Sequence, residues 1–151
     1  MVERKEYLEQ LIGWKEEQVI KVVTGIRRCG MSVMLELVKQ KLLDSGVGAE
    51  QFSTLNFEDL RNAPLCRAEA LHAEILRRAA AIPGKAYLFF DGIQEVQEWE
   101  KCVNSLRVAL DCDIYITGSN AKLLSGELAT YLGGRYVEFV IYPFSFAEFL
   151  E

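Results

Sequence analysis

The sequence predicts an α/β fold in which a parallel sheet of about five strands has helices on both faces. Two observations lead to this prediction. Short apolar segments alternate along the chain with amphipathic segments of helical spacing. The short segments are apolar nearly throughout, as in "YLFF" at 87–90, and such strands are buried on both faces of a parallel sheet. The 151 residues can form one sizeable core, so residues 1–151 are expected to be a single domain.

The first half of the chain alternates helix, strand, helix and strand. Residues 3–14 place apolar side chains on one helical face, and the apolar run "VIKVVTG" at 19–25 is a strand that ends at a glycine. "QFSTLNFED" at 51–59 is expected to be the second strand. A helix is expected over 32–44, because apolar residues recur there at helical spacing, namely Met34, Leu35, Val38 and Leu42.

The second half repeats this alternation. A helix over about 68–81 is closed by Pro83-Gly84, a pair that breaks helices. "AYLFFD" at 86–91 is the third strand and meets its first charge at Asp91. The remaining expected elements are a helix at about 97–110, a strand at 112–120, and a fifth strand at 135–142 after a short helical stretch and Gly133-Gly134.

The C-terminus carries the signature of a helix start. In "SFAE" at 145–148, Ser145 is able to cap a helix and Glu148 is able to return the bond. The chain stops three residues later, so the helix expected over 145–151 is cut short. This ending predicts an excised domain or a truncated product.

Composition and charge narrow the class of protein. Hydrophobic residues make up 50% of the chain, charged residues 26%, and the net charge is −5. A broad nucleic-acid interface needs a basic face, so this balance argues against one. No apolar run approaches the length of a membrane span. The charged N-terminus "MVERKEYLEQ" lacks the apolar stretch of a signal peptide.

The cysteines and the histidine give no sign of a metal site. The four cysteines form neither a CxxC motif nor a Cys/His pair with metal-ligand spacing. Reduced cysteines in a cytoplasmic protein are therefore expected. His72 is the single histidine and lies in an amphipathic helix, so neither metal binding nor general-base chemistry is expected of it. The cysteines are Cys29, Cys66, Cys102 and Cys112.

The connection between the first strand and the next helix has the spacing of a phosphate-binding loop. Gly25 and Gly30 bracket four residues, and Ser32 closes the pattern. Such a loop points backbone N–H groups at an anion, and the helix N-terminus adds partial positive charge. The pattern has a lysine where this chain has Met31. The alternative is a strand–turn–helix connection that binds no ligand.

The residues expected to contact a nucleotide are those of this loop. Arg27 and Arg28 face either phosphate or solvent, and Cys29 is interpreted as a spacer because no base is placed to activate it. The full candidate set is Thr24, Gly25, Ile26, Arg27, Arg28, Cys29, Gly30, Met31, Ser32 and Val33.

Polar residues end two more strands at the edge where ligands bind to parallel sheets. Asp91 is placed to hold magnesium, with a buried or capping aspartate as the alternative. Gly92 stands where many ATPases have a glutamate, and Glu95 is expected to point elsewhere. The fourth strand ends in Thr117, Ser119 and Asn120, with Asn120 either positioning a water or capping a helix.

The whole chain resembles the N-terminal ATPase domain of a bacterial and archaeal family of AAA-type P-loop ATPases. The resemblance rests on "QVIKVVTGIRRCG", "STLNFED", "YLFFDGIQEVQEWEKCVNSLR", "DIYITGSNAKLLSGELATYLGGRYVEF" and "YPFSFAEFLE". It implies a three-layer P-loop NTPase fold with sheet order 5-1-4-3-2, and ATP and Mg²⁺ as cofactors. It also implies Ser32 and Asp91 at magnesium, Asn120 as a sensing residue, and Arg135 as an arginine near the nucleotide. A C-terminal domain of uncharacterised function usually follows in this family, so such a domain is the expected partner.

Two departures from the family pattern fall on residues tied to hydrolysis. The Walker A pattern "RRSGKS" is replaced by "RRCGMS", and the Walker B pattern "DEIQ" by "DGIQ". The resulting hypothesis is an ATP-binding domain with weak affinity and hydrolysis close to undetectable. One alternative is a nucleotide-free scaffold. The other is an active ATPase in which Arg27, Arg28, Lys122 or a neighbouring subunit replaces the lost groups, although nothing in the sequence establishes an oligomer.

Overall fold

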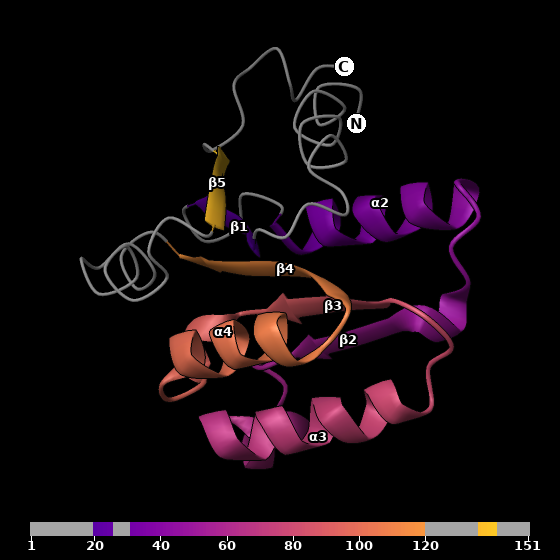
Figure 1. Cartoon of the computed structure of the whole chain (residues 1–151). Coiled ribbons are helices and arrows are strands. Elements are labelled where there is room, and N and C mark those ends of the chain that lie inside the picture. The colour runs from indigo at the N-terminus through magenta and orange to yellow at the C-terminus, as the bar shows by residue number, and fades with distance from the viewer. Residues whose placement is uncertain (1–19, 26–30, 120–135, 142–151) are drawn as a thin grey trace.

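A five-stranded parallel sheet forms the centre of the computed structural model, which describes residues 20–25, 31–119 and 136–141 (Figure 1). The strand order is β2-β3-β4-β1-β5, and every described pairing is parallel. Read from the other edge, this is the expected order 5-1-4-3-2, so that prediction is confirmed. The strands are β1 (Ile20–Gly25), β2 (Phe52–Asn56), β3 (Ala86–Asp91), β4 (Cys112–Ser119) and β5 (Tyr136–Ile141).

Helices cover both faces of the sheet and make three layers (Figure 1). The described helices are α2 (Met31–Asp44), α3 (Ala68–Ala80) and α4 (Trp99–Ala109), with short 3₁₀ helices at Ala49–Gln51, Leu60–Leu65 and Ile93–Glu95. Apolar side chains of α2 pack on one face of the sheet, and those of α3 and α4 pack on the other. The expected α/β architecture with helices on both faces is therefore confirmed.

The third strand shows why the apolar runs are continuous. Successive side chains of a strand point to opposite faces. Tyr87 and Phe89 of β3 lie in the cluster under α2, whereas Leu88 and Phe90 lie in the cluster under α3 and α4. All four are at most 4% exposed. Burial on both sides thus requires apolar residues at every position until the strand ends at Asp91.

Two expected boundaries need correction. The second strand ends at Asn56 rather than at 59, because the Asn56 side chain accepts a hydrogen bond from the N–H of Glu58 at 3.0 Å and turns the chain. The fourth expected helix begins at Trp99 rather than 97, because Glu98 has a positive φ of 57°. The helices expected at 3–14 and 145–151 and the helical stretch before the fifth strand lie outside the described residues.

A buried ion pair that the sequence analysis did not anticipate joins β1 to β4. Lys21 Nζ contacts Asp113 Oδ1, and both side chains are 0% exposed. The Tyr115 hydroxyl donates to Asp113 Oδ2 at 3.1 Å, and Lys21 Nζ lies 5.4 Å from the centroid of the Tyr115 ring. These residues lie near the amino ends of their strands, on the α2 face and away from the edge that carries Gly25.

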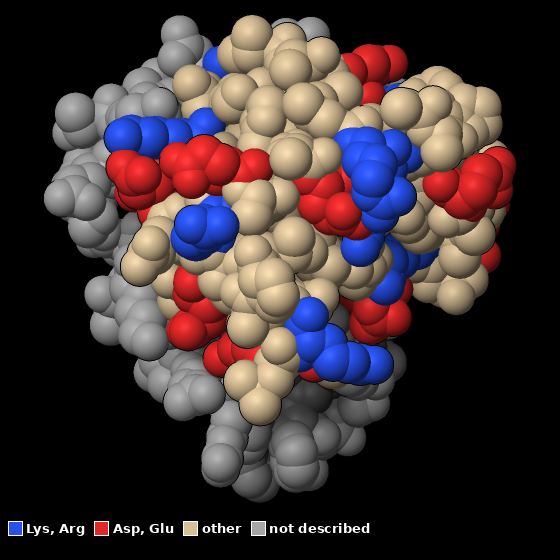
Figure 2. Space-filling view, turned by 90° about the horizontal axis from the view of Figure 1, so that it is seen from below, with Lys and Arg blue, Asp and Glu red and all other residues tan. Residues whose placement is uncertain are grey.

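The face that carries α3 mixes charges of both signs (Figure 2). On α3, Glu74 pairs with Arg77 at 2.5 Å and with Arg78 at 2.7 Å. Hydrogen bonds from Arg77 first and Arg78 second lower the pKa of Glu74 to about 2. On the described part of this face, basic side chains are therefore interspersed with acidic ones, unlike the uniformly basic surface of a broad nucleic-acid interface. Among the described helices, none combines the length and the apolar character that crossing a membrane requires.

Candidate functional site

The candidate site begins where β1 ends and α2 begins. Thr24 is fully buried at the end of β1, opposite Gly118 in the register, and Gly25 lies opposite Ser119. Helix α2 starts at Met31, and its first turn contains no acidic residue. The partial positive charge of this helix N-terminus is therefore not offset by a carboxylate of its own first turn. The strand and the helix that bracket the expected loop are both in place.

A threonine hydroxyl ties Asp91 to the neighbouring strand. Asp91 ends β3, and its Oδ1 accepts a hydrogen bond from Thr117 Oγ1 of β4 at 2.6 Å. The same hydroxyl accepts from the N–H of Gly92 at 3.1 Å. By strand alternation, Asp91 and Thr117 lie on the sheet face that α2 covers. Two of the strand ends expected to share one edge are thus joined by a direct contact.

Gly92 adopts a conformation that suits glycine. Its φ is 73° and its ψ is 39°, in the left-handed region, and it precedes the short helix Ile93–Glu95. A Cβ added at this position would lie 3.2 Å from Cγ of Glu58. Glu95 is exposed. Burial raises the pKa of the Cys66 thiol, and the negative charge of Glu95 is the second cause of this shift. The expectation that Glu95 points away from Asp91 agrees with this placement.

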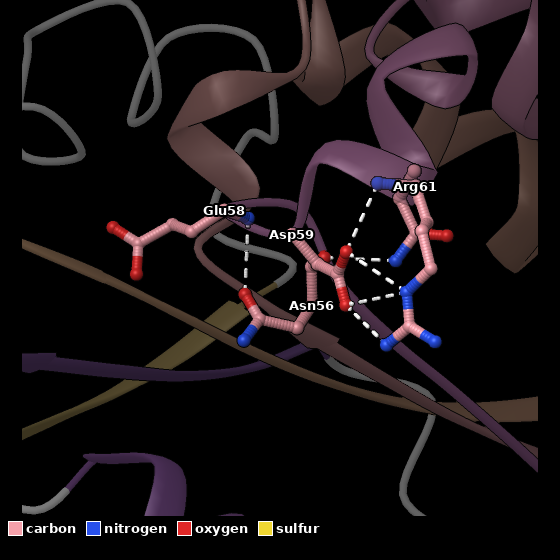
Figure 3. Close-up of polar contacts among 5 residues, drawn as sticks. Asn56, Glu58, Asp59 and Arg61 are labelled. Atoms are coloured by element: carbon pink, nitrogen blue, oxygen red, sulfur yellow. Dashed lines mark hydrogen bonds and ion pairs between the residues drawn. The ribbon is translucent and has the colours of Figure 1, made fainter.

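The turn after β2 holds a set of polar residues that the sequence analysis missed (Figure 3). Asn56 lies opposite Asp91 in the register of β2 and β3. Asp59 accepts from the backbone N–H of Arg61 at 2.9 Å and from its guanidinium at 2.6 Å. The side-chain hydrogen bond from Arg61 lowers the pKa of Asp59 to about 2. The run "NFED" at 56–59 was the available signal, but the predicted strand 51–59 includes it.

The structure describes some of the expected site residues and not others. Residues 26–30, Asn120 and Arg135 lie outside the described residues, and Met31, Ser32 and Ser119 are placed by backbone alone. Val33 is 42% exposed on α2. Within the described ranges there is no group of three or more His, Cys, Asp or Glu side chains that could hold a metal. A magnesium site here would therefore need hydroxyl or phosphate oxygens as well as Asp91.

The surroundings of His72, Cys102 and Cys112 are consistent with structural roles. His72 Nε2 lies 2.9 Å from Ser105 Oγ and links α3 to α4. Burial raises the pKa of Cys102 to about 12, and burial followed by the charge of Asp113 raises that of Cys112 to about 12. Neither of these two thiols has the thiolate character of a nucleophile at neutral pH.

Replacing Thr117 with valine is expected to lower the free energy of unfolding by about 1–3 kcal/mol. Valine keeps the shape but removes the hydroxyl that joins Asp91 to the N–H of Gly92. Urea unfolding would measure the loss. Thr54→Val is the matched control, because Thr54 is exposed on β2 and makes a 3.3 Å contact with Lys39. Equal effects of the two substitutions would contradict the bridging role of Thr117.

Comparisons with known proteins show which sequences and folds this chain is similar to. A family model described as "AAA domain" matches residues 17–150. An uncharacterised protein of Haemophilus influenzae is 47% identical over 151 residues, and the chain spans only 38% of that relative's length.

Two solved structures share the fold at low identity. A DNA polymerase III gamma subunit-related protein of Thermotoga maritima has a TM-score of 0.65 at 13% identity, covering 94% of this chain and 47% of that one. AMPPCP-bound DnaA of Aquifex aeolicus has a TM-score of 0.55 at 15% identity, covering 89% of this chain and 44% of that one.

Proposed function

Because the chain belongs to the AAA domain family, we propose that it binds ATP with Mg²⁺ at the carboxyl edge of its sheet and hydrolyses it poorly. The observation that carries this proposal is the 2.6 Å hydrogen bond from Thr117 to Asp91. This bond fixes the carboxylate of β3 to β4, and β4 in turn pairs with β1, the strand that precedes α2. The fold is also shared with DnaA, which was solved with AMPPCP bound.

The groups at this edge fit a magnesium nucleotide. Magnesium prefers hard oxygen ligands, and the carboxylate of Asp91 and the hydroxyl of Ser32 are of that kind. The N-terminus of α2, which has no acidic residue in its first turn, suits a phosphate. We assign the phosphates to the loop from Thr24 to Val33, a sensing role to Asn120, and a position near the nucleotide to Arg135. Bound Mg²⁺ would supply charge neutralisation for the phosphates.

Met31 is the main reason to expect weak binding and slow hydrolysis. A hydrogen bond to a charged group contributes roughly 1.5–3 kcal/mol. The absence of a lysine at this position should therefore weaken ATP binding by roughly ten- to a hundredfold. A lysine there would also stabilise charge that develops in the transition state. Gly92 removes a second group, because glycine offers no carboxylate to the attacking water.

The Haemophilus influenzae relative is longer than this chain, and its additional length leads to a proposal about the partner of this domain. The chain spans 38% of the Haemophilus influenzae protein. We propose that a further domain in such longer proteins responds to the nucleotide state of this one, as the family pattern of an ATPase domain followed by a C-terminal domain implies.

Met31→Lys is expected to tighten Mg-ATP binding at least about tenfold. The introduced ammonium would reach the β- and γ-phosphates. Calorimetric titration of the parent chain and the variant measures the change. Gln40→Lys adds the same charge on an exposed position of α2 and is expected to leave affinity unchanged. Absence of binding by both the parent and Met31→Lys would overturn the proposal and favour a nucleotide-free scaffold.

A further inference from the structure

We propose that Glu58 is the carboxylate that orients the attacking water in this site, in place of the side chain that Gly92 lacks. The inference rests on the proposed ATP site and names one of its catalytic residues. Glu58 belongs to neither the phosphate loop nor the strand end at Asp91. It lies in the turn after β2, which the sequence analysis took for part of the strand.

The backbone before Glu58 is fixed to Asp91. Strands β2 and β3 pair with Asn56 opposite Asp91. One residue further on, the N–H of Phe57 donates to the carbonyl oxygen of Asp91 at 2.9 Å. The Phe57 ring is 4% exposed and lies 5.8 Å from the ring of Phe90. Glu58 therefore follows a residue that is anchored both by its backbone and by its side chain.

Asn56 then sets the direction of the turn. Its Oδ1 accepts from the N–H of Glu58 at 3.0 Å, and its carbonyl oxygen accepts from Asn62 Nδ2 at 2.9 Å. Asp59 makes the bidentate contact with Arg61, whose Nε donates to Oδ1 and whose Nη2 donates to Oδ2. In Figure 3 the Glu58 side chain extends away from Asp59 and Arg61. The side chains of Glu58 and Asp59 therefore point in different directions.

The Glu58 side chain covers the position that a side chain at residue 92 would occupy. A Cβ on Gly92 would lie 3.2 Å from Cγ and 3.7 Å from Cδ of Glu58. The first distance is shorter than ordinary van der Waals contact, so a side chain at residue 92 would require Glu58 to shift by a few tenths of an ångström. The N–H of Gly92 is held by the same Thr117 hydroxyl that binds Asp91. The carboxyl group of Glu58 therefore lies beside the peptide that follows the proposed magnesium ligand.

A carboxylate in this place has a defined task in ATP hydrolysis. The oxygen of water forms a bond to the γ-phosphorus, and the bond from that phosphorus to the bridging oxygen breaks. The electron pair of the broken bond stays on ADP. Glu58 accepts a hydrogen bond from the water and takes up the proton that it loses, and the proton then passes to the phosphate product or to solvent. Every atom in this step comes from ATP, water and one side chain.

The test uses the full 151-residue chain with Met31→Lys, so that nucleotide binding is strong enough to measure turnover. In that background, Glu58→Gln is expected to lower kcat by roughly a hundredfold or more. The Kd for Mg-ATP from calorimetry should change by less than about threefold, since the residue acts on water rather than on the phosphates. Glu58→Asp, which keeps a carboxylate on a shorter side chain, should recover part of the rate.

Glu95→Gln is the matched control. Like Glu58, Glu95 is an exposed glutamate, and it follows Asp91 closely in sequence. It should leave kcat unchanged. Turnover that is insensitive to Glu58→Gln, or that falls equally with Glu95→Gln, would overturn the role of Glu58. Binding by Met31→Lys without any turnover would overturn it as well, while the proposed ATP site would stand. Absence of binding by Met31→Lys would overturn both.

Discussion

Asp113→Ala is expected to lower the free energy of unfolding by about 3–5 kcal/mol, because Lys21 would stay buried without the carboxylate that faces it. Both side chains are 0% exposed, and the charge of Lys21 cannot reach water without disturbing the sheet. The Tyr115 hydroxyl would lose its 3.1 Å contact with Asp113 as well. Urea or thermal unfolding measures this loss, which is large for a single side chain.

The control and the double variant make this prediction specific. Asp111 is exposed two residues away, and Asp111→Ala should change stability by no more than about 0.5 kcal/mol. Lys21→Met combined with Asp113→Leu removes both charges and should recover much of the stability, because burying an ion pair costs desolvation that apolar residues avoid. If Asp113→Ala proved as mild as Asp111→Ala, the ion pair would not stabilise the fold.

Phe89→Ala is expected to lower the free energy of unfolding by about 3–5 kcal/mol. Phe89 is 0% exposed in β3 and belongs to the cluster under α2. Its ring stacks on Tyr115 with centroids 5.1 Å apart, and Phe52 meets it edge-on at 5.4 Å. The substitution would lose this burial and leave a cavity against the helix that carries the candidate phosphate site.

Denaturant unfolding with a graded series tests this expectation. Phe89→Leu keeps most of the volume and should cost less than Phe89→Ala. Val108→Ala removes apolar atoms from a side chain that is 72% exposed, so it should stay within about 0.5 kcal/mol of the parent. A Phe89→Ala loss no larger than that of Val108→Ala would contradict a packed core at this place.

The parallel sheet was predictable from β3, because a strand that is buried on both faces carries a continuous run of apolar residues. The run from Ala86 to Asp91 was assigned its observed bounds, since its apolar residues stop at the first charge. The helix 32–44 was placed almost as well, as α2 begins at Met31 and ends at Asp44. Both elements are defined by the side chains they themselves carry, so local sequence was sufficient.

Features that depend on distant residues were not predictable in this way. Lys21 sits within an apolar strand, and its partner Asp113 is 92 positions away. Only the strand order, which the family resemblance supplied, and the register could bring them together. The placement of Glu58 next to the space beside Gly92 also depends on the register of β2 on β3 and on the left-handed backbone at residue 92. The sequence located the Thr117 and Asp91 strand ends but not the hydrogen bond between them.

The ion pair of Lys21 with Asp113 also favours one register of β1 along β4. A one-residue slip of β1 along β4 would turn Lys21 toward the apolar cluster under α3 and α4, where it would meet no carboxylate of β4. A two-residue slip toward the carboxyl end of β4 would bring Lys21 opposite Thr117 and separate the two charges. Both misaligned sheets would lose the ion pair near the amino ends of β1 and β4. The same alignment sets Gly25 opposite Ser119 at the far end, so two charges remote from the candidate site select the geometry in which that site is assembled.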